Sequence, residues 1–126
     1  QTEVDLRGNR LKAPDAVLLS FDLEFNRALT ALDVSGNDIG GSGKSAIGDA
    51  LLSTSGSKLQ FFTCNKWSIK ADTPSLDLRS KRLDNADAKL LAGVIKFSRA
   101  LTSLTLFNNE IGAGGAKAIA DSLPQS

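Results

Sequence analysis

The chain contains no histidine and no tyrosine, and its only cysteine is Cys64. The commonest general acid–base residues are therefore missing, and we expect no enzymatic activity. Metal sites built from cysteine and histidine are excluded by count, and we expect no cofactor. One cysteine allows no disulfide within the chain, and no Asn-x-Ser/Thr sequence occurs. Both features favour a reducing, cytoplasmic location.

Long apolar runs and an excess of one charge are also missing. No run approaches the roughly 18 apolar residues that a membrane-spanning helix needs. The 15 basic and 14 acidic residues give a net charge of +1, so no overall field attracts nucleic acid or anionic lipid. We expect neither as a partner. Because the chain opens at Gln1 and contains no methionine, we interpret it as a fragment of a larger intracellular protein.

What the chain does contain is an internal repeat. Residues 101–123 match residues 29–51 position for position. The coinciding pairs are Leu29/Leu101, Leu32/Leu104, Val34/Leu106, Asn37/Asn109, Ile39/Ile111, Gly43/Gly115 and Ile47/Ile119. A repeat of this kind determines the architecture before any single residue is considered.

The same pattern predicts one domain, residues 1–126, made of five copies. We place the copies near residues 1–28, 29–58, 59–72, 73–100 and 101–126. Each copy reads as a short strand, a turn and a helix, except the third. That copy is much shorter than the others and is followed by Pro74, which leaves no room for a helix.

The helices are predicted from apolar spacing and end signals. Pro14 suits the first turn of one helix, and a second is expected near residues 44–52. For the fourth copy, Asp84 or Asn85 is the expected N-cap. Its buried face should consist of Leu90, Leu91, Val94 and Ile95. The last helix should end before Pro124.

Neither a strand nor a helix of this kind can bury its apolar side alone, so the copies should stack. We predict a parallel sheet backed by helices, with right-handed crossovers. Asn9, Asn37 and Asn109 follow three of the strands. Their side-chain amides should bind backbone groups of the bend that leaves the sheet.

The pattern L-x-x-L-x-L-x-x-N-x-[IL] followed by a helix, in units of about 28 residues, resembles the leucine-rich repeat family of the ribonuclease-inhibitor type. Residues 64–67 and 76–83 are also similar to repeat arrays of unicellular eukaryotes. Trp67 and Lys81 depart from the pattern at positions where asparagine is usual. The resemblance implies an α/β solenoid shaped as a horseshoe arc, with the sheet on a concave, protein-binding face.

The outward-facing positions of the strands are the candidate binding residues. The middle column is Asp5, Asp33, Thr63, Asp77 and Thr105, and flanking positions hold Arg7, Phe61, Asn65, Arg79 and Phe107. Adjacent strands lie about 4.8 Å apart, so Asp5 and Asp33 should lie side by side. They form either a patch for a basic partner or a divalent ion, or two solvated carboxylates near Arg7.

Several other residues have two possible roles. Phe61 and Phe107 are either interface anchors or cover for neighbouring strands. Trp67 either fills the core where the third copy lacks a helix or, with Lys66 and Lys81, forms an edge that contacts a partner. Cys64 takes an inward position and should be a buried thiol.

These observations favour a non-enzymatic module that binds a protein of unknown identity. Two alternatives remain open. Related arrays activate small GTPases, so the chain could be a regulatory repeat domain. It could also be a structural array that self-associates through its C-terminal strand, because neither end shows a polar capping element.

One motif suggests nucleotide binding, and it gives a testable prediction. Gly43-Lys44-Ser45 follows a strand and opens a helix, as in a phosphate-binding loop, but position 38 is Asp where that motif needs glycine. We therefore expect neither ATP nor GTP, with magnesium, to raise the melting temperature. A nucleotide at 100 times its Kd would stabilise the fold by about 2.7 kcal/mol. A clear shift that is lost in Lys44→Ala would contradict the prediction.

Overall fold

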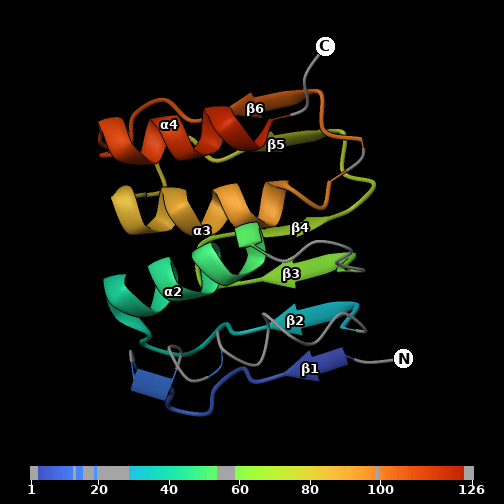
Figure 1. The fold of residues 1–126 in the computed structure, drawn as a ribbon, viewed down its shortest axis with the longest axis vertical. Helices are drawn as coiled ribbons and strands as arrows, with labels where there is room; N and C mark the ends of the chain where they lie inside the picture. Colours follow the sequence, from blue (N-terminus) through green and yellow to red (C-terminus); the bar gives the residue numbers. More distant parts are fainter. Residues whose placement is uncertain are drawn as a thin grey trace.

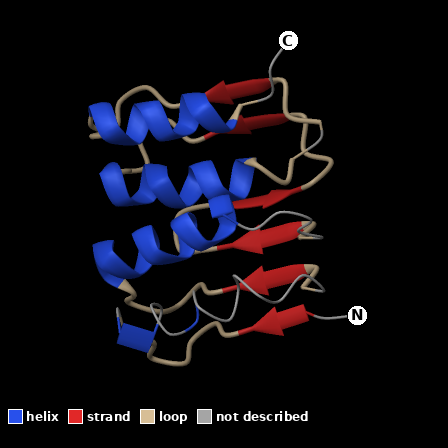
Figure 2. Cartoon of the chain, in the orientation of Figure 1, coloured by secondary structure: helices blue, strands red, loops and turns tan. Residues whose placement is uncertain are grey.

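The computed structural model describes residues 3–12, 14–15, 19, 29–53, 59–98 and 100–123. Strands lie along one side of the molecule and helices along the other, stacked in chain order (Figure 1). Figure 2 shows the same separation into a strand layer and a helix layer. The strands are β1 (Glu3–Asp5), β2 (Ala31–Asp33), β3 (Phe61–Thr63), β4 (Ser68–Lys70), β5 (Ser75–Asp77) and β6 (Ser103–Thr105).

The strand register reproduces the spacing of the sequence repeat. Glu3 lies opposite Ala31 in the parallel pair β1–β2, and Ser75 lies opposite Ser103 in β5–β6. Ala31 lies opposite Phe61 in β2–β3. In each pair a residue faces its counterpart in the next copy. The predicted parallel stacking of consecutive copies is therefore confirmed for these pairs.

The sequence predicts a single continuous parallel sheet, and this prediction is wrong. The strands form a four-stranded sheet, β1-β2-β3-β4, and a separate pair, β5-β6. The two sheets part at β4, which pairs antiparallel to β3. A parallel return needs a crossover of a dozen or more residues, and the short third copy has none. The chain therefore turns back at once, and the parallel pattern resumes at β5.

The hairpin of β3 and β4 lies in the strand layer and contributes side chains to the core (Figure 1). Trp67 is 7% exposed, and its ring centroid lies 5.3 Å from that of Phe62. Ile69 of β4 is also buried. The interpretation of Trp67 as a core residue at the helix-less copy is thus confirmed.

The helices are α2 (Gly40–Ser53), α3 (Asn85–Ile95) and α4 (Ala113–Ser122). Helix α2 begins at Gly40, earlier than the predicted residues 44–52, and its first turn contains Gly40, Gly41 and Gly43. Residues 14, 15 and 19 are helical, but the rest of the helix predicted after Pro14 lies outside the described residues. Pro124 lies outside them too.

The core lies between the strand layer and the helices. Leu32 and Phe62 point into it from the sheet and are fully buried, while Ile47 fills it from α2. All four apolar residues predicted for the buried face of α3 are buried: Leu90, Leu91, Val94 and Ile95. Leu104, the counterpart of Leu32 in β6, is only partly buried. None of the described helices is long and apolar enough to cross a membrane.

Helix α3 lies between α2 and α4 (Figure 1), and its contact with α2 is closest at two glycines. A Cβ added to Gly48 would lie 2.5 Å from the carbonyl oxygen of Lys89. A Cβ on Gly93 would lie 2.6 Å from the carbonyl oxygen of Gly48. Because both obstacles are backbone atoms, a larger residue would have to push the helices apart.

We therefore predict that Gly48→Ala lowers the free energy of unfolding by about 1–3 kcal/mol through overpacking. Gly41→Ala is the matched control in the same helix, because its Cβ would lie 3.7 Å from that of Ala86, an ordinary contact. That substitution should be neutral or stabilising by about 0.5–1 kcal/mol. Urea denaturation measures both, and equal effects would contradict the close packing of α2 and α3.

Candidate functional site

The outward residues of the strands form two rows rather than one. The register places Asp5, Asp33 and Thr63 side by side across β1, β2 and β3. Asp77 and Thr105 are neighbours in the second sheet. The five-residue column expected from the sequence is therefore interrupted, because Ser68 of β4 takes the place beside Thr63.

The strand carboxylates bind residues two positions later in the chain. Asp5 lies 3.0 Å from Nε of Arg7, and Asp77 lies 3.1 Å from Nε of Arg79. Asp33 accepts hydrogen bonds from the backbone N–H and the hydroxyl of Ser35. Arg7 thus lies beside Asp5, as the interpretation of solvated carboxylates supposes, and the four charged side chains remain largely exposed.

A hollow of about 350 Å³ lies over the first sheet. Ala31 has the smallest side chain in its row and lies between Glu3 and Phe61. The lining residues are Glu3, Asp5, Arg7, Ala31, Leu32, Asp33 and Phe61. Three carboxylates and one guanidinium give the hollow a net negative character, and Phe61 adds an aromatic wall.

The two phenylalanines of the strand face lie in different surroundings. Phe61 is half-buried beside the hollow. Phe107, just after β6, is 59% exposed, and the guanidinium carbon of Arg79 lies 5.7 Å from the centre of its ring. Arg79 therefore covers part of Phe107, and the two form an exposed cation–π pair.

The proposed edge of Lys66, Trp67 and Lys81 needs correction. Trp67 is buried in the core and offers no contact surface. Lys66 points to Asp87, at 2.9 Å, and to the carbonyl oxygen of Arg82, at 2.7 Å. Lys81 is exposed, and its backbone N–H donates to the side chain of Asn109. The three residues do not form one surface, because only Lys81 remains exposed.

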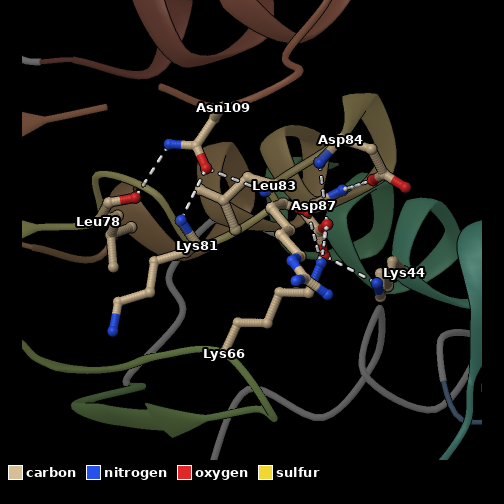
Figure 3. Close-up of polar contacts among 9 residues, drawn as sticks. Lys44, Lys66, Leu78, Lys81, Leu83, Asp84, Asp87 and Asn109 are labelled. Carbon is tan, nitrogen blue, oxygen red and sulfur yellow. Dashed lines mark hydrogen bonds and ion pairs between the residues drawn. The ribbon is translucent and has the colours of Figure 1, made fainter. Parts of the chain in front are cut away.

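Asparagine side chains connect neighbouring copies. The Oδ1 of Asn37 accepts from the N–H groups of Asn9 and Leu11, and its Nδ2 donates to the carbonyl of Leu6. Asn109 makes the same contacts at the second sheet: its Oδ1 accepts from the N–H groups of Lys81 and Leu83, and its Nδ2 donates to the carbonyl of Leu78 (Figure 3). The predicted role of these amides in the bends is confirmed for Asn37 and Asn109, but most of their bonds reach back to the preceding copy.

Asn65 has a related role in the third copy. Its Oδ1 accepts from the N–H of Gly36, and its Nδ2 donates to the carbonyl of Asn37 at 2.8 Å. It was predicted as a contact for a partner, but its side chain is engaged with the second copy. Asn65 thus partly replaces the amide that is missing where Trp67 stands.

Asp87 forms an ion cluster that the sequence analysis missed. Its side chain is 3% exposed and lies 2.8 Å from Nζ of Lys44 and 2.9 Å from Nζ of Lys66 (Figure 3). It also completes a capping box with Asp84 at the start of α3. The spacing of two acids three residues apart at a helix start was the available signal. Lys44 of the phosphate-loop-like motif is therefore already paired with a carboxylate.

Cys64 lies next to this cluster. It borders a pocket of about 110 Å³ together with Lys44, Lys66 and Asp87. Burial raises the pKa of the Cys64 thiol to about 11, despite hydrogen bonds from the backbone that act in the opposite direction. The thiol is partly buried rather than fully buried as expected. At neutral pH it is protonated and weakly nucleophilic.

The Asp87 cluster gives a prediction for pH dependence. Burial alone would raise the pKa of Asp87, but hydrogen bonds from Lys44, the backbone of Asp84 and Lys66 lower it from 3.8 to about 2. The folded state therefore holds this carboxylate ionised where the unfolded chain would bind a proton. Its stabilisation should be complete above about pH 4 and lost as the pH falls through about 2.

We expect Asp87→Asn to lower the melting temperature at pH 7, with the difference from the original chain shrinking towards pH 2. Asp121→Asn is the control, because its pair with Lys117 is exposed on α4, and surface pairs contribute little. Thermal melts across this pH range measure both. A constant difference between Asp87→Asn and the original chain would show that the cluster is not the source of acid sensitivity.

Comparison with known protein families finds two matches to the leucine-rich repeat model, at residues 25–48 and 97–120. The matched segments are separated by the same offset as the two halves of the internal repeat. The comparison with curated proteins found no match. Leucine-rich repeats commonly mediate protein–protein interaction and are generally non-enzymatic. The two matches and the α/β arrangement of strands and helices support a leucine-rich repeat protein.

Proposed function

We propose that the chain is a protein-binding module of the ribonuclease-inhibitor type of leucine-rich repeat, whose curved strand face contacts the partner. The observation that carries this proposal is the hollow over Ala31, with carboxylates on its walls and Phe61 beside it. It lies over β1, β2 and β3, and its shape arises because an alanine falls between larger residues in one row.

The chemistry of the hollow favours a basic side chain of the partner. Asp5 and Asp33 can attract a lysine or arginine, although Arg7 already offsets part of the negative charge. The aliphatic stem of such a residue would lie on Ala31, and its cationic end would stack on Phe61. Phe107 and Arg79 provide a second aromatic contact on the other sheet.

The proposal can be tested with a displayed library of random peptides selected on the whole chain. We expect the selected peptides to share a lysine or arginine flanked by apolar residues. Their affinity should fall as the ionic strength rises, because the recognising charges are exposed. Peptides without a basic residue would contradict the assignment of the hollow.

Two variants locate the binding site. Ala31→Arg places a basic side chain in the hollow, so binding of the selected peptides should fall at least tenfold, a loss of about 1.4 kcal/mol. Ser103→Arg is the matched control at the equivalent position of β6, where the residue is exposed. It should leave binding unchanged. Equal binding to both variants would place the site away from the first sheet.

A further inference from the structure

The regular asparagine contacts are interrupted inside the stack, at the third copy. The Oδ1 of Asn37 accepts from the N–H groups of Asn9 and Leu11. Asn109 accepts in the same way from two N–H groups of the fourth copy. The register of β2 and β3 sets Trp67 at the position that Asn37 holds one copy earlier. Because an indole has no acceptor atom, the amide oxygen has no counterpart at the third copy.

Two backbone N–H groups therefore lack the partner that their equivalents have. The N–H groups of Asn37 and Ile39 hold the positions of the two groups that Asn37 itself binds in the first copy. Within the described part of the chain, no side-chain oxygen accepts from either of them. Asn65 accepts from the N–H of Gly36 instead. Both residues are buried, so a group that accepts from these donors would bind favourably.

Asn37 and Ile39 both line the pocket of about 110 Å³ beside Cys64. A water molecule needs roughly 10–15 Å³ of such space. The pocket therefore accommodates a group of several heavy atoms, and it is far too small for a nucleotide. Its lining residues lie between Val34 and Leu90, in the second, third and fourth copies. The pocket thus does not depend on where the chain begins or ends.

The charged residues of the pocket favour a negative ligand. Lys44 and Lys66 both approach the carboxylate of Asp87, at 2.8 and 2.9 Å (Figure 3). Two positive charges meet one negative charge, which leaves this cluster with a net charge of +1. Asp38 also lines the pocket, but its side chain is 84% exposed and lies 3.8 Å from Nζ of Lys12. A single negative charge in the pocket would therefore balance the cluster, which matters because unbalanced buried charge is costly.

The lysines and the start of α2 supply further donors. A lysine ammonium has three N–H groups, and the described contacts of Lys44 use one of them, on Asp87. The pocket also borders Gly40, where α2 begins. The start of a helix carries a partial positive charge, and its first N–H groups have no partner within the helix. An anion in the pocket therefore meets backbone and side-chain donors together.

We propose that this pocket binds a small monovalent anion, held by the N–H groups of Asn37 and Ile39 and balanced in charge by Lys44 and Lys66. The anion takes the place that the asparagine oxygen takes in the regular copies. A halide and a small carboxylate such as formate share this chemistry. A doubly charged anion fits less well, because its second charge would lie close to Asp87 with no cation to balance it. The inference is independent of the proposed function of the strand face.

Heteronuclear NMR of the isotope-labelled chain tests the assignment directly. We expect the N–H signals of Asn37 and Ile39 to shift and to saturate as sodium formate or sodium chloride is added at pH 7. The signals of Asn9 and Leu11 are the internal control, because Asn37 already binds these N–H groups, and they should not shift. Equal shifts of all four signals, or shifts that never saturate, would overturn the proposal and leave the pocket to water. Tighter binding of sodium sulfate than of formate would contradict a monovalent ligand.

A pair of lysine variants tests the role of the charge. Lys44→Gln removes one positive charge and keeps an N–H donor for Asp87, so formate binding should weaken by about tenfold or more, the loss expected for one charge-assisted contact. Lys117→Gln is the matched control, because it removes the same charge from an exposed pair on α4, and it should bind formate like the original chain. Equal weakening in both variants would show that net charge alone attracts the anion. The signals of the original chain decide the question even if Lys44→Gln fails to fold.

Discussion

The structure depends on one side-chain amide placed at the bend of successive copies. Asn37 and Asn109 satisfy backbone groups that no sheet or helix ladder can reach, two N–H groups and a carbonyl at once. The accepted N–H groups lie on either side of Arg10 and Arg82, both in the left-handed region. That conformation costs roughly 1–2 kcal/mol for such residues. The amide therefore fixes both the bend and its distance from the previous one.

The amide is missing from the third and fourth copies, where Trp67 and Lys81 stand, and the break between the two sheets lies between these copies. Trp67 replaces the asparagine in the third copy, and its side chain turns into the core beside Phe62. The connections that remain come from other residues: Asn65 binds the second copy, and Lys66 binds Asp87 of the fourth. The split between the two sheets is thus bridged by side chains and by the packing of α2 on α3 rather than by strand pairing.

The sequence predicts those parts of the fold that recur. The regular spacing of the copies locates the parallel strands, and apolar spacing identifies the buried face of α3, because each depends on contacts that every copy repeats. It fails at β4, since Ser68–Lys70 becomes a strand only by pairing with β3. It also missed the cluster at Asp87, whose two lysines come from the second and third copies and are distant in the chain. The interrupted column of outward residues follows from the same unpredicted strand.

Because the pKa of the Cys64 thiol is high, its rate of alkylation measures how often the structure around it opens. With its pKa raised from 9.0 to about 11, only about one Cys64 thiol in ten thousand is ionised at pH 7, against about one in a hundred without the shift. Alkylating reagents should therefore react slowly until the β3–β4 hairpin separates from α2. Because the chain has one cysteine, the labelling rate measures local opening at one position, the junction between the two sheets.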